Sequence, residues 1–284
     1  MTTIMKLFLS FYLLLFFAIT TSFAQTSRVS PDRVNWKKVK VLVYTKNGPG
    51  YVHDNIQNAV WSIQRMGQEN GFRVDTSAQS DVFTEANLRQ YSALIFTSTN
   101  NDVFDTDGQR LAFRRYIESG GGFVGIHSVV GTERKWTWFK RMMGGTFLWH
   151  AKHQPMRLRV LAAQHPSMNG VPTIWSRSDE CYFLKELSPG PTTVLASELA
   201  SLNPNEAEKV KLSAGTYTDL YPSAWYYDFD GGHTWCTMLG HAKTDYDDPT
   251  FVNHIFQGIR YVVSRVKTID GGKAYAKTVD EEVR

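Results

Sequence analysis

The sequence predicts an α/β protein with an open, mostly parallel sheet and helices on both faces. Two observations carry this prediction. Continuous apolar runs, typical of strands buried on both faces, alternate up to residue 145 with segments whose apolar residues recur at helical spacing. A later hairpin pattern adds an antiparallel extension to the sheet. Strands that alternate with helices are joined by right-handed crossovers, so the early strands are expected to be parallel.

An export signal precedes the first strand. Residues 1–24 combine Lys6, a long apolar run and the small residues Ser22 and Ala24, which is the pattern of a signal peptide cleaved after Ala24. The alternative is an uncleaved anchor, because the apolar run is nearly long enough to span a bilayer. Cleavage predicts an exported protein, periplasmic or extracellular, without a stable membrane span.

The first strand leads into a helix with clear boundaries. Asp54 is expected to cap this helix and Gly71 to end it. The apolar residues that define its buried face are Ile56, Val60, Ile63 and Met66. The four strands of the parallel part are expected at residues 39–45, 72–78, 93–99 and 123–128.

Two more helices separate the third and fourth strands from their predecessors. Thr84 caps a short helix at 85–91, and Asp107 opens a longer one that ends at the glycines 120–122. The apolar face of the longer helix consists of Leu111, Phe113, Tyr116 and Ile117. This alternation completes the parallel half of the predicted sheet.

The pattern changes in the second half of the chain. The turn sequence Asp-Gly-Gly joins two strands at 223–229 and 233–239 into a hairpin, and residues 249–265 return to helical spacing. Shorter strands are expected at 156–162 and 192–197. The resulting division is a signal peptide at 1–24, a polar leader at 25–36, one domain at 37–267, and a polar, loosely held tail at 268–284.

Composition excludes some partners. The net charge is +4, from 31 basic and 27 acidic residues that are interspersed, so no basic stripe for nucleic acid is present. Cys181 and Cys236 are the only cysteines and do not form a zinc-binding pattern. In an oxidising compartment they either pair or remain buried thiols. The sequence fixes no oligomeric state.

Three histidines follow predicted strands. His53 lies beyond the first strand, His127 ends the fourth, and His241 follows the second strand of the hairpin. Ligands of open α/β sheets collect beyond the carboxyl ends of the strands, so we expect the three imidazoles to meet in one pocket. Each one taken alone is also compatible with a structural role. Together they are candidate metal ligands, and His53 is also a candidate substrate-binding residue.

Two adjacent carboxylates, Asp179 and Glu180, are candidate catalytic residues beside His127 and His241. In an extended segment they point to opposite faces, so only one can face the pocket. That one would act as general acid or base, bind a metal, or orient an imidazole, unless the pair is a solvated loop. The aromatic residues predicted to bind substrate by stacking, or else to pack within the sheet, are Tyr182, Trp225 and Tyr226.

The remaining histidines give weaker signals. His150 and His153 have a spacing that resembles a zinc pair, but no predicted helix holds them together. His165, His233 and His254 are expected to be structural.

Several segments of the chain are similar to those of a known family. The segments that carry this resemblance are "VLVYTKNGPGYVHD", "GGGFVGIHS", "MMGGTFLWH", "QHPSMNGVPTIW", "DECYFL" and "TMLGHAKTDYDDPTFVNHIFQGIRYVV". The chain resembles the ThuA-like, or trehalose-utilisation, family, whose fold is that of the class I glutamine amidotransferases and is flavodoxin-like. In those amidotransferases a cysteine nucleophile occupies the position of His127. The thiol is absent here, so amidotransferase activity is rejected.

The resemblance implies a role in carbohydrate catabolism. We expect an enzyme that hydrolyses or isomerises a glycoside or its keto derivative, because a base and an electrophile together activate the position next to a carbonyl. In one version a divalent ion, zinc, manganese or iron, is the electrophile; in the other the histidines and a carboxylate transfer protons directly. The alternatives are a non-catalytic saccharide-binding protein and a purely structural role in an exported assembly.

Overall fold

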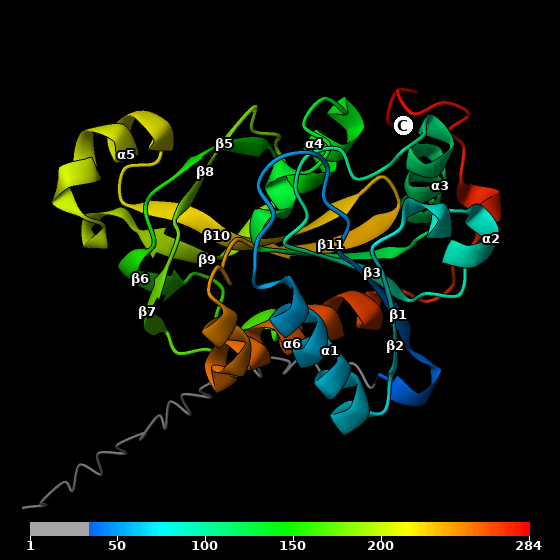
Figure 1. Cartoon of the computed structure of the whole chain (residues 1–284), viewed down its shortest axis with the longest axis horizontal. Coiled ribbons are helices and arrows are strands. Elements are labelled where there is room, and N and C mark those ends of the chain that lie inside the picture. Colours follow the sequence, from blue (N-terminus) through cyan, green and yellow to red (C-terminus); the bar gives the residue numbers. More distant parts are fainter. Residues whose placement is uncertain (1–33) are drawn as a thin grey trace, which may run out of the picture. The chain divides into compact units, whose positions relative to one another are not determined.

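A mixed nine-stranded sheet runs through the part of the chain that the structure describes, residues 34–284 (Figure 1). The structure is a computed structural model, and these residues belong to one compact unit. The predicted signal peptide and most of the predicted leader lie outside the described residues. None of the helices within 34–284 has the length and apolar character needed to cross a bilayer.

The parallel half of the sheet confirms the prediction. Its strand order is β2-β1-β3-β4, and each adjacent pair is parallel. The bounds are β1 Lys40–Tyr44, β2 Arg73–Ser77, β3 Ala93–Thr97 and β4 Gly122–Ile126. The next strand, β11 (Gly232–Thr237), is parallel to β4, so the carboxyl ends of β1, β3, β4 and β11 lie at one edge of the sheet.

The antiparallel half continues from β11 in the order β10-β9-β6-β7. These strands are β10 Leu220–Phe229, β9 Thr192–Glu198, β6 Gln154–Val160 and β7 Ile174–Asp179. A second, two-stranded sheet pairs β5 (Thr146–His150) with β8 (Tyr182–Lys185), which the sequence pattern did not predict. It brings His150 opposite Tyr182.

Helices cover both faces of the large sheet. Figure 1 shows α1 and α6 on one face and α3 and α4 on the other, in keeping with the two separate apolar clusters of the core. The helices are α1 Ile56–Asn70, α2 Glu85–Leu88, α3 Asp107–Glu118, α4 Thr137–Met143, α5 Ala207–Ala214 and α6 Pro249–Arg265.

Helix boundaries follow the expected residues with one correction. Thr84 caps α2, and Gly71 ends α1 in the left-handed conformation that glycine adopts without strain. The residue before α1 is Asn55 rather than Asp54, and its side chain does not cap the helix. The side-chain amide of Asn55 instead donates hydrogen bonds to backbone carbonyls of the loop that follows β11.

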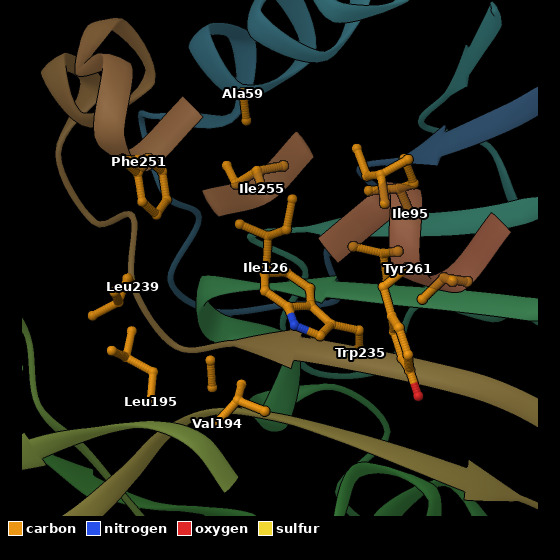
Figure 2. Packing of buried hydrophobic residues seen from close by; sticks show 14 of the residues in the cluster. Ala59, Ile95, Ile126, Val194, Leu195, Trp235, Leu239, Phe251, Ile255 and Tyr261 are labelled. Atoms are coloured by element: carbon orange, nitrogen blue, oxygen red, sulfur yellow. The ribbon is translucent and has the colours of Figure 1, made fainter. Parts of the chain in front are cut away.

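Figure 2 shows the core between the sheet and helices α1 and α6. Ile126 and Trp235, from neighbouring parallel strands, pack beneath Ala59 of α1 and Ile255 of α6. Gly258 allows this close approach, because a Cβ there would overlap the ring of Trp235. Apolar burial on both faces of β4 and β11 holds their carboxyl ends in fixed positions.

The C-terminal tail is docked, contrary to prediction. The fully buried guanidinium of Arg114 pairs with Glu118 at 2.8 Å and donates to the carbonyls of Val279 and Glu281 at 3.1 and 2.6 Å. Glu118 also accepts the backbone N–H groups of Tyr275 and Ala276. The tail therefore satisfies a buried ion pair on α3, which a polar composition does not reveal. Both cysteines are buried free thiols.

Candidate functional site

His127 adopts an unusual backbone conformation directly after β4. Its φ is +61°, in the left-handed region that costs a non-glycine residue about 1–2 kcal/mol, and it begins a 3₁₀ turn over His127–Gly131. The ring is completely buried, and Nδ1 lies 3.2 Å from the carbonyl oxygen of Met238. Since a carbonyl only accepts, Nδ1 carries the proton and Nε2 keeps a free lone pair. Such strain is found where a side chain must be aimed.

His53 approaches His127 from the loop after β1. The two ring centroids are 4.5 Å apart, and both rings are buried. Nδ1 of His53 lies 3.3 Å from the hydroxyl of Ser128, which itself donates to the carbonyl of Thr99 at 3.1 Å. The hydroxyl therefore accepts from Nδ1–H, and Nε2 of His53 also keeps its lone pair.

His241 and Glu180 complete the cluster. The His241 ring centroid is 5.3 Å from that of His127 and 5.8 Å from that of His53. Nδ1 of His241 is 3.2 Å from Oε2 of Glu180, which directly follows β7. One donor atom from each of the four residues lies within 4.8 Å of all the others. The predicted convergence of the three imidazoles is therefore present.

The pKa values of two imidazoles of the cluster are lowered, and that of the third is raised. Burial, together with the charge of His241, lowers the pKa of His53 to about 4. Burial and the two neighbouring imidazoles also hold the pKa of His127 well below its usual range. Contact with Glu180 outweighs burial and raises the pKa of His241. Burial alone would raise the pKa of Glu180, but His241, His150 and His53 lower it, so the carboxylate stays ionised.

This donor set fits a divalent metal ion. Two neutral imidazoles with free lone pairs, a third imidazole and a carboxylate are the ligands that zinc, manganese or iron accept. Oε2 of Glu180 and Nδ1 of His241 are buried and lie 3.2 Å apart, and beyond this contact neither atom has a hydrogen-bond partner among the described residues. Buried polar atoms normally have their bonding capacity satisfied, and an ion shared by these two atoms would satisfy both.

Asp179 is turned away from the imidazoles. Its carboxylate is fully buried and accepts the backbone N–H groups of Gly240 at 2.9 Å and His241 at 3.3 Å. It also accepts the N–H of Glu180 and pairs with Arg177 at 3.0 Å. Asp179 therefore has no free oxygen for catalysis, which corrects its predicted role. Its position fixes the backbone of both His241 and Glu180, and Glu180 is the carboxylate that faces the cluster.

Three further residues hold the loop that carries His241. Arg177, buried between the rings of Trp175 and Phe251, bridges Asp179 and Asp245. Asp245 accepts the N–H of Ala242, while Asn55 donates to the carbonyls of Gly240 and His241 at 2.7 and 2.9 Å. Sequence reasoning missed this network, which joins Asn55, Arg177 and Asp245 across more than half of the chain.

His150 and Tyr182 line the cluster on the side of the small sheet. Nδ1 of His150 is 3.3 Å from Oε1 of Glu180, and its ring stacks on Tyr182 with centroids 5.3 Å apart. The Tyr182 hydroxyl lies 3.5 Å from Nε2 of His127, so this predicted substrate-binding residue borders the cluster. His150 was only a weak signal in the sequence, because the β5–β8 pairing that positions it was not predicted.

The two other predicted aromatic contacts are not at the cluster. Trp225 is 2% exposed and belongs to the apolar cluster that also contains residues of α3 and α4. Tyr226 stacks on His165 at 4.3 Å and contacts Tyr261 of α6. Both rings pack against the large sheet, so neither offers a free face to a sugar beside the imidazoles. The structural roles expected for the outlying histidines hold for His254, which contacts Thr237, for His165, and for His233, which pairs with Asp228.

The fold and site define an α/β protein with a buried histidine–carboxylate cluster at the carboxyl ends of its parallel strands. Comparison with known proteins then gives the family. The model of the ThuA family, described as trehalose utilisation, matches residues 40–262. The chain belongs to this carbohydrate-related family. No curated protein sequence matches it.

Solved structures support the fold. A ThuA-like protein from Bacteroides uniformis ATCC 8492 is 21% identical, with a TM-score of 0.68 over 84% of this chain and 97% of that one. A ThuA-like protein from Parabacteroides merdae ATCC 43184 is 18% identical, with a TM-score of 0.62 over 79% and 90%. The cold-adapted β-galactosidase from Rahnella sp. R3 is 13% identical, with a TM-score of 0.51 over 78% of this chain but 30% of its own.

Proposed function

We propose that the protein is an exported enzyme that hydrolyses or isomerises a glycoside or keto-glycoside at the histidine cluster, with one divalent metal ion bound there. The observation that carries the proposal is the convergence of four donor atoms within 4.8 Å in a buried setting. Membership of a carbohydrate-related family supports a carbohydrate as the substrate class. The signal-peptide pattern of residues 1–24 supports export.

The residues that would hold the ion are His53, His127, His241 and Glu180. A bound divalent ion would polarise a substrate oxygen. Met238 and Ser128 hold the rings of His127 and His53 in the tautomer that leaves Nε2 free, as outer partners of metal-binding histidines commonly do. Zinc, manganese and iron all accept this mixed set.

Tyr182 is the polar group best placed to contact a substrate oxygen. Burial and the nearby carboxylates hold the pKa of Tyr182 well above its usual range, so the hydroxyl stays protonated and donates a hydrogen bond. Its position beside His127 places that donor at the cluster.

Thiol chemistry does not compete with this proposal. Burial raises the pKa of Cys181 to about 12 and raises that of Cys236 as well, so neither provides a thiolate at neutral pH. Cys236 lies within β11 and Cys181 follows Glu180, while His127 occupies the strand end itself.

Turnover by the purified protein tests the proposal. Trehalose and 3-keto-trehalose are incubated with the protein, and the sugars are followed by NMR, which detects hydrolysis and isomerisation alike. We expect turnover that falls about 100-fold or more in His127→Ala. The matched control is His233→Ala, which removes an imidazole from the far end of β11 and should keep activity near that of the wild type.

Two results would contradict the proposal. Full activity in His127→Ala would remove this residue from the reaction. Binding of sugar without any turnover by the wild type would identify a saccharide-binding protein instead.

A further inference from the structure

An exposed aromatic ring stands directly beside the histidine cluster. Tyr51 is 62% exposed, and its ring meets that of His53 edge to face, with centroids 4.8 Å apart. Val52, the next residue, is also largely exposed. An apolar ring left open to water at the edge of a buried polar cluster is a surface that a ligand of that cluster would cover.

The loop that presents Tyr51 is held against the neighbouring loop after β3. The N–H of Gly48 donates to the carbonyl of Asn100 at 2.9 Å, and the amide of Asn101 donates to the carbonyl of Pro49 at 2.9 Å. A Cβ at Gly48 would lie 2.5 Å from the backbone nitrogen of Asp102, so glycine is needed for the two loops to approach this closely. Tyr51 is therefore presented by an ordered loop, which lowers the entropic cost of binding.

We propose that Tyr51 is the platform on which a pyranose ring of the substrate stacks, an inference that rests on the proposed function. A pyranose has a face of C–H groups that packs on an aromatic ring, while its hydroxyls remain free for polar partners. The ring of His53 adjoins Tyr51, so a sugar stacked on Tyr51 places the next atoms of the substrate beside His53, whose ring in turn lies 4.5 Å from that of His127. The predicted platform residues, Trp225 and Tyr226, are packed elsewhere, and Tyr51 takes their place.

Trp61 provides a matched control. It is 60% exposed, almost the same as Tyr51, but it lies on α1 rather than on the loop before that helix. Removal of either ring leaves the core intact, so thermal unfolding should be unchanged in both variants.

Steady-state kinetics with trehalose and 3-keto-trehalose test the platform. Stacking holds substrate and transition state alike, so Tyr51→Ala should raise KM about tenfold with kcat unchanged, and Tyr51→Trp should restore KM. Trp61→Ala should match the wild type in both constants.

The inference is overturned if KM is unchanged in Tyr51→Ala, if Trp61→Ala shows the same increase, or if Tyr51→Ala lowers kcat alone. In each of these cases the wild type still turns over sugar, so the proposed function stands. A wild-type protein that turns over neither sugar refutes the proposed function, and the platform with it.

Discussion

Replacement of Asp179 by asparagine should both destabilise the protein and disorder the site. The two side chains have nearly the same shape, so Asp179→Asn changes the charge and one acceptor without opening a cavity. An asparagine cannot accept with both of its terminal atoms. At least one of the N–H groups now bound, those of Gly240, His241 and Glu180, therefore loses its acceptor in a fully buried place.

The size of the expected destabilisation follows from the contacts that Asp179 makes. One buried N–H without a partner costs about 1–3 kcal/mol. Removing one member of a buried ion pair costs about 3–5 kcal/mol, and Arg177 keeps its second partner, Asp245, at 2.6 Å, which reduces that loss. Burial and the charge of Asp179 raise the pKa of Asp245 to about 6, so the substitution also relieves a repulsion. We expect a net loss of about 3 kcal/mol in the free energy of unfolding.

Urea unfolding followed by circular dichroism measures this loss. The control is Glu85→Gln, which breaks an ion pair with Arg115 on the surface and should cost less than about 1 kcal/mol. Sugar turnover should fall in Asp179→Asn under conditions where the variant is folded, because His241 and Glu180 are no longer fixed. If Asp179→Asn is as stable as Glu85→Gln and as active as the wild type, the positioning role of Asp179 is refuted.

Two further predictions concern parts of the fold outside the cluster. Burial and the nearby Arg177 lower the pKa of His254 to about 3, well below its unfolded value. The stability that neutral His254 contributes is present above pH 6.5 and is lost as the pH falls, by about 2 kcal/mol at pH 5. The difference in unfolding free energy between pH 7 and pH 5 should therefore be smaller by that amount in His254→Gln than in the wild type. An unchanged difference would contradict this assignment. Arg114→Met removes the cation that holds the C-terminal tail, so hydrogen exchange of residues 275–284 should accelerate while that of β4 stays slow; an equally protected tail would show that other contacts hold it.

Local patterns were sufficient to predict the parallel half of the sheet and the meeting of the three histidines. Buried parallel strands such as β4 appear as continuous apolar runs, and the strand-end rule then places His127 and His241 at one edge without any knowledge of side-chain contacts. This part of the site follows from topology.

The rest depends on long-range contacts between segments with no distinctive local pattern. β5 and β8 are short, and their pairing, which positions His150, is visible only in three dimensions. The position of Arg177 is also visible only in three dimensions. A charged side chain is expected at the surface unless its two buried carboxylate partners are known. For Trp225 and Tyr226 the error was to predict a ligand contact where the ring packs in the fold. An aromatic residue in a strand is packed in the core more often than it contacts a ligand.

The metal content of the purified protein tests the central claim most directly. After incubation with zinc, manganese or iron and removal of unbound ions, elemental analysis should find about one ion per chain in the wild type and in Glu85→Gln. Glu180→Gln should lose most of that ion, because a neutral amide replaces the only carboxylate among the four donors. A wild-type protein that retains none of the three ions, or a Glu180→Gln variant that retains as much as the wild type, would contradict the account.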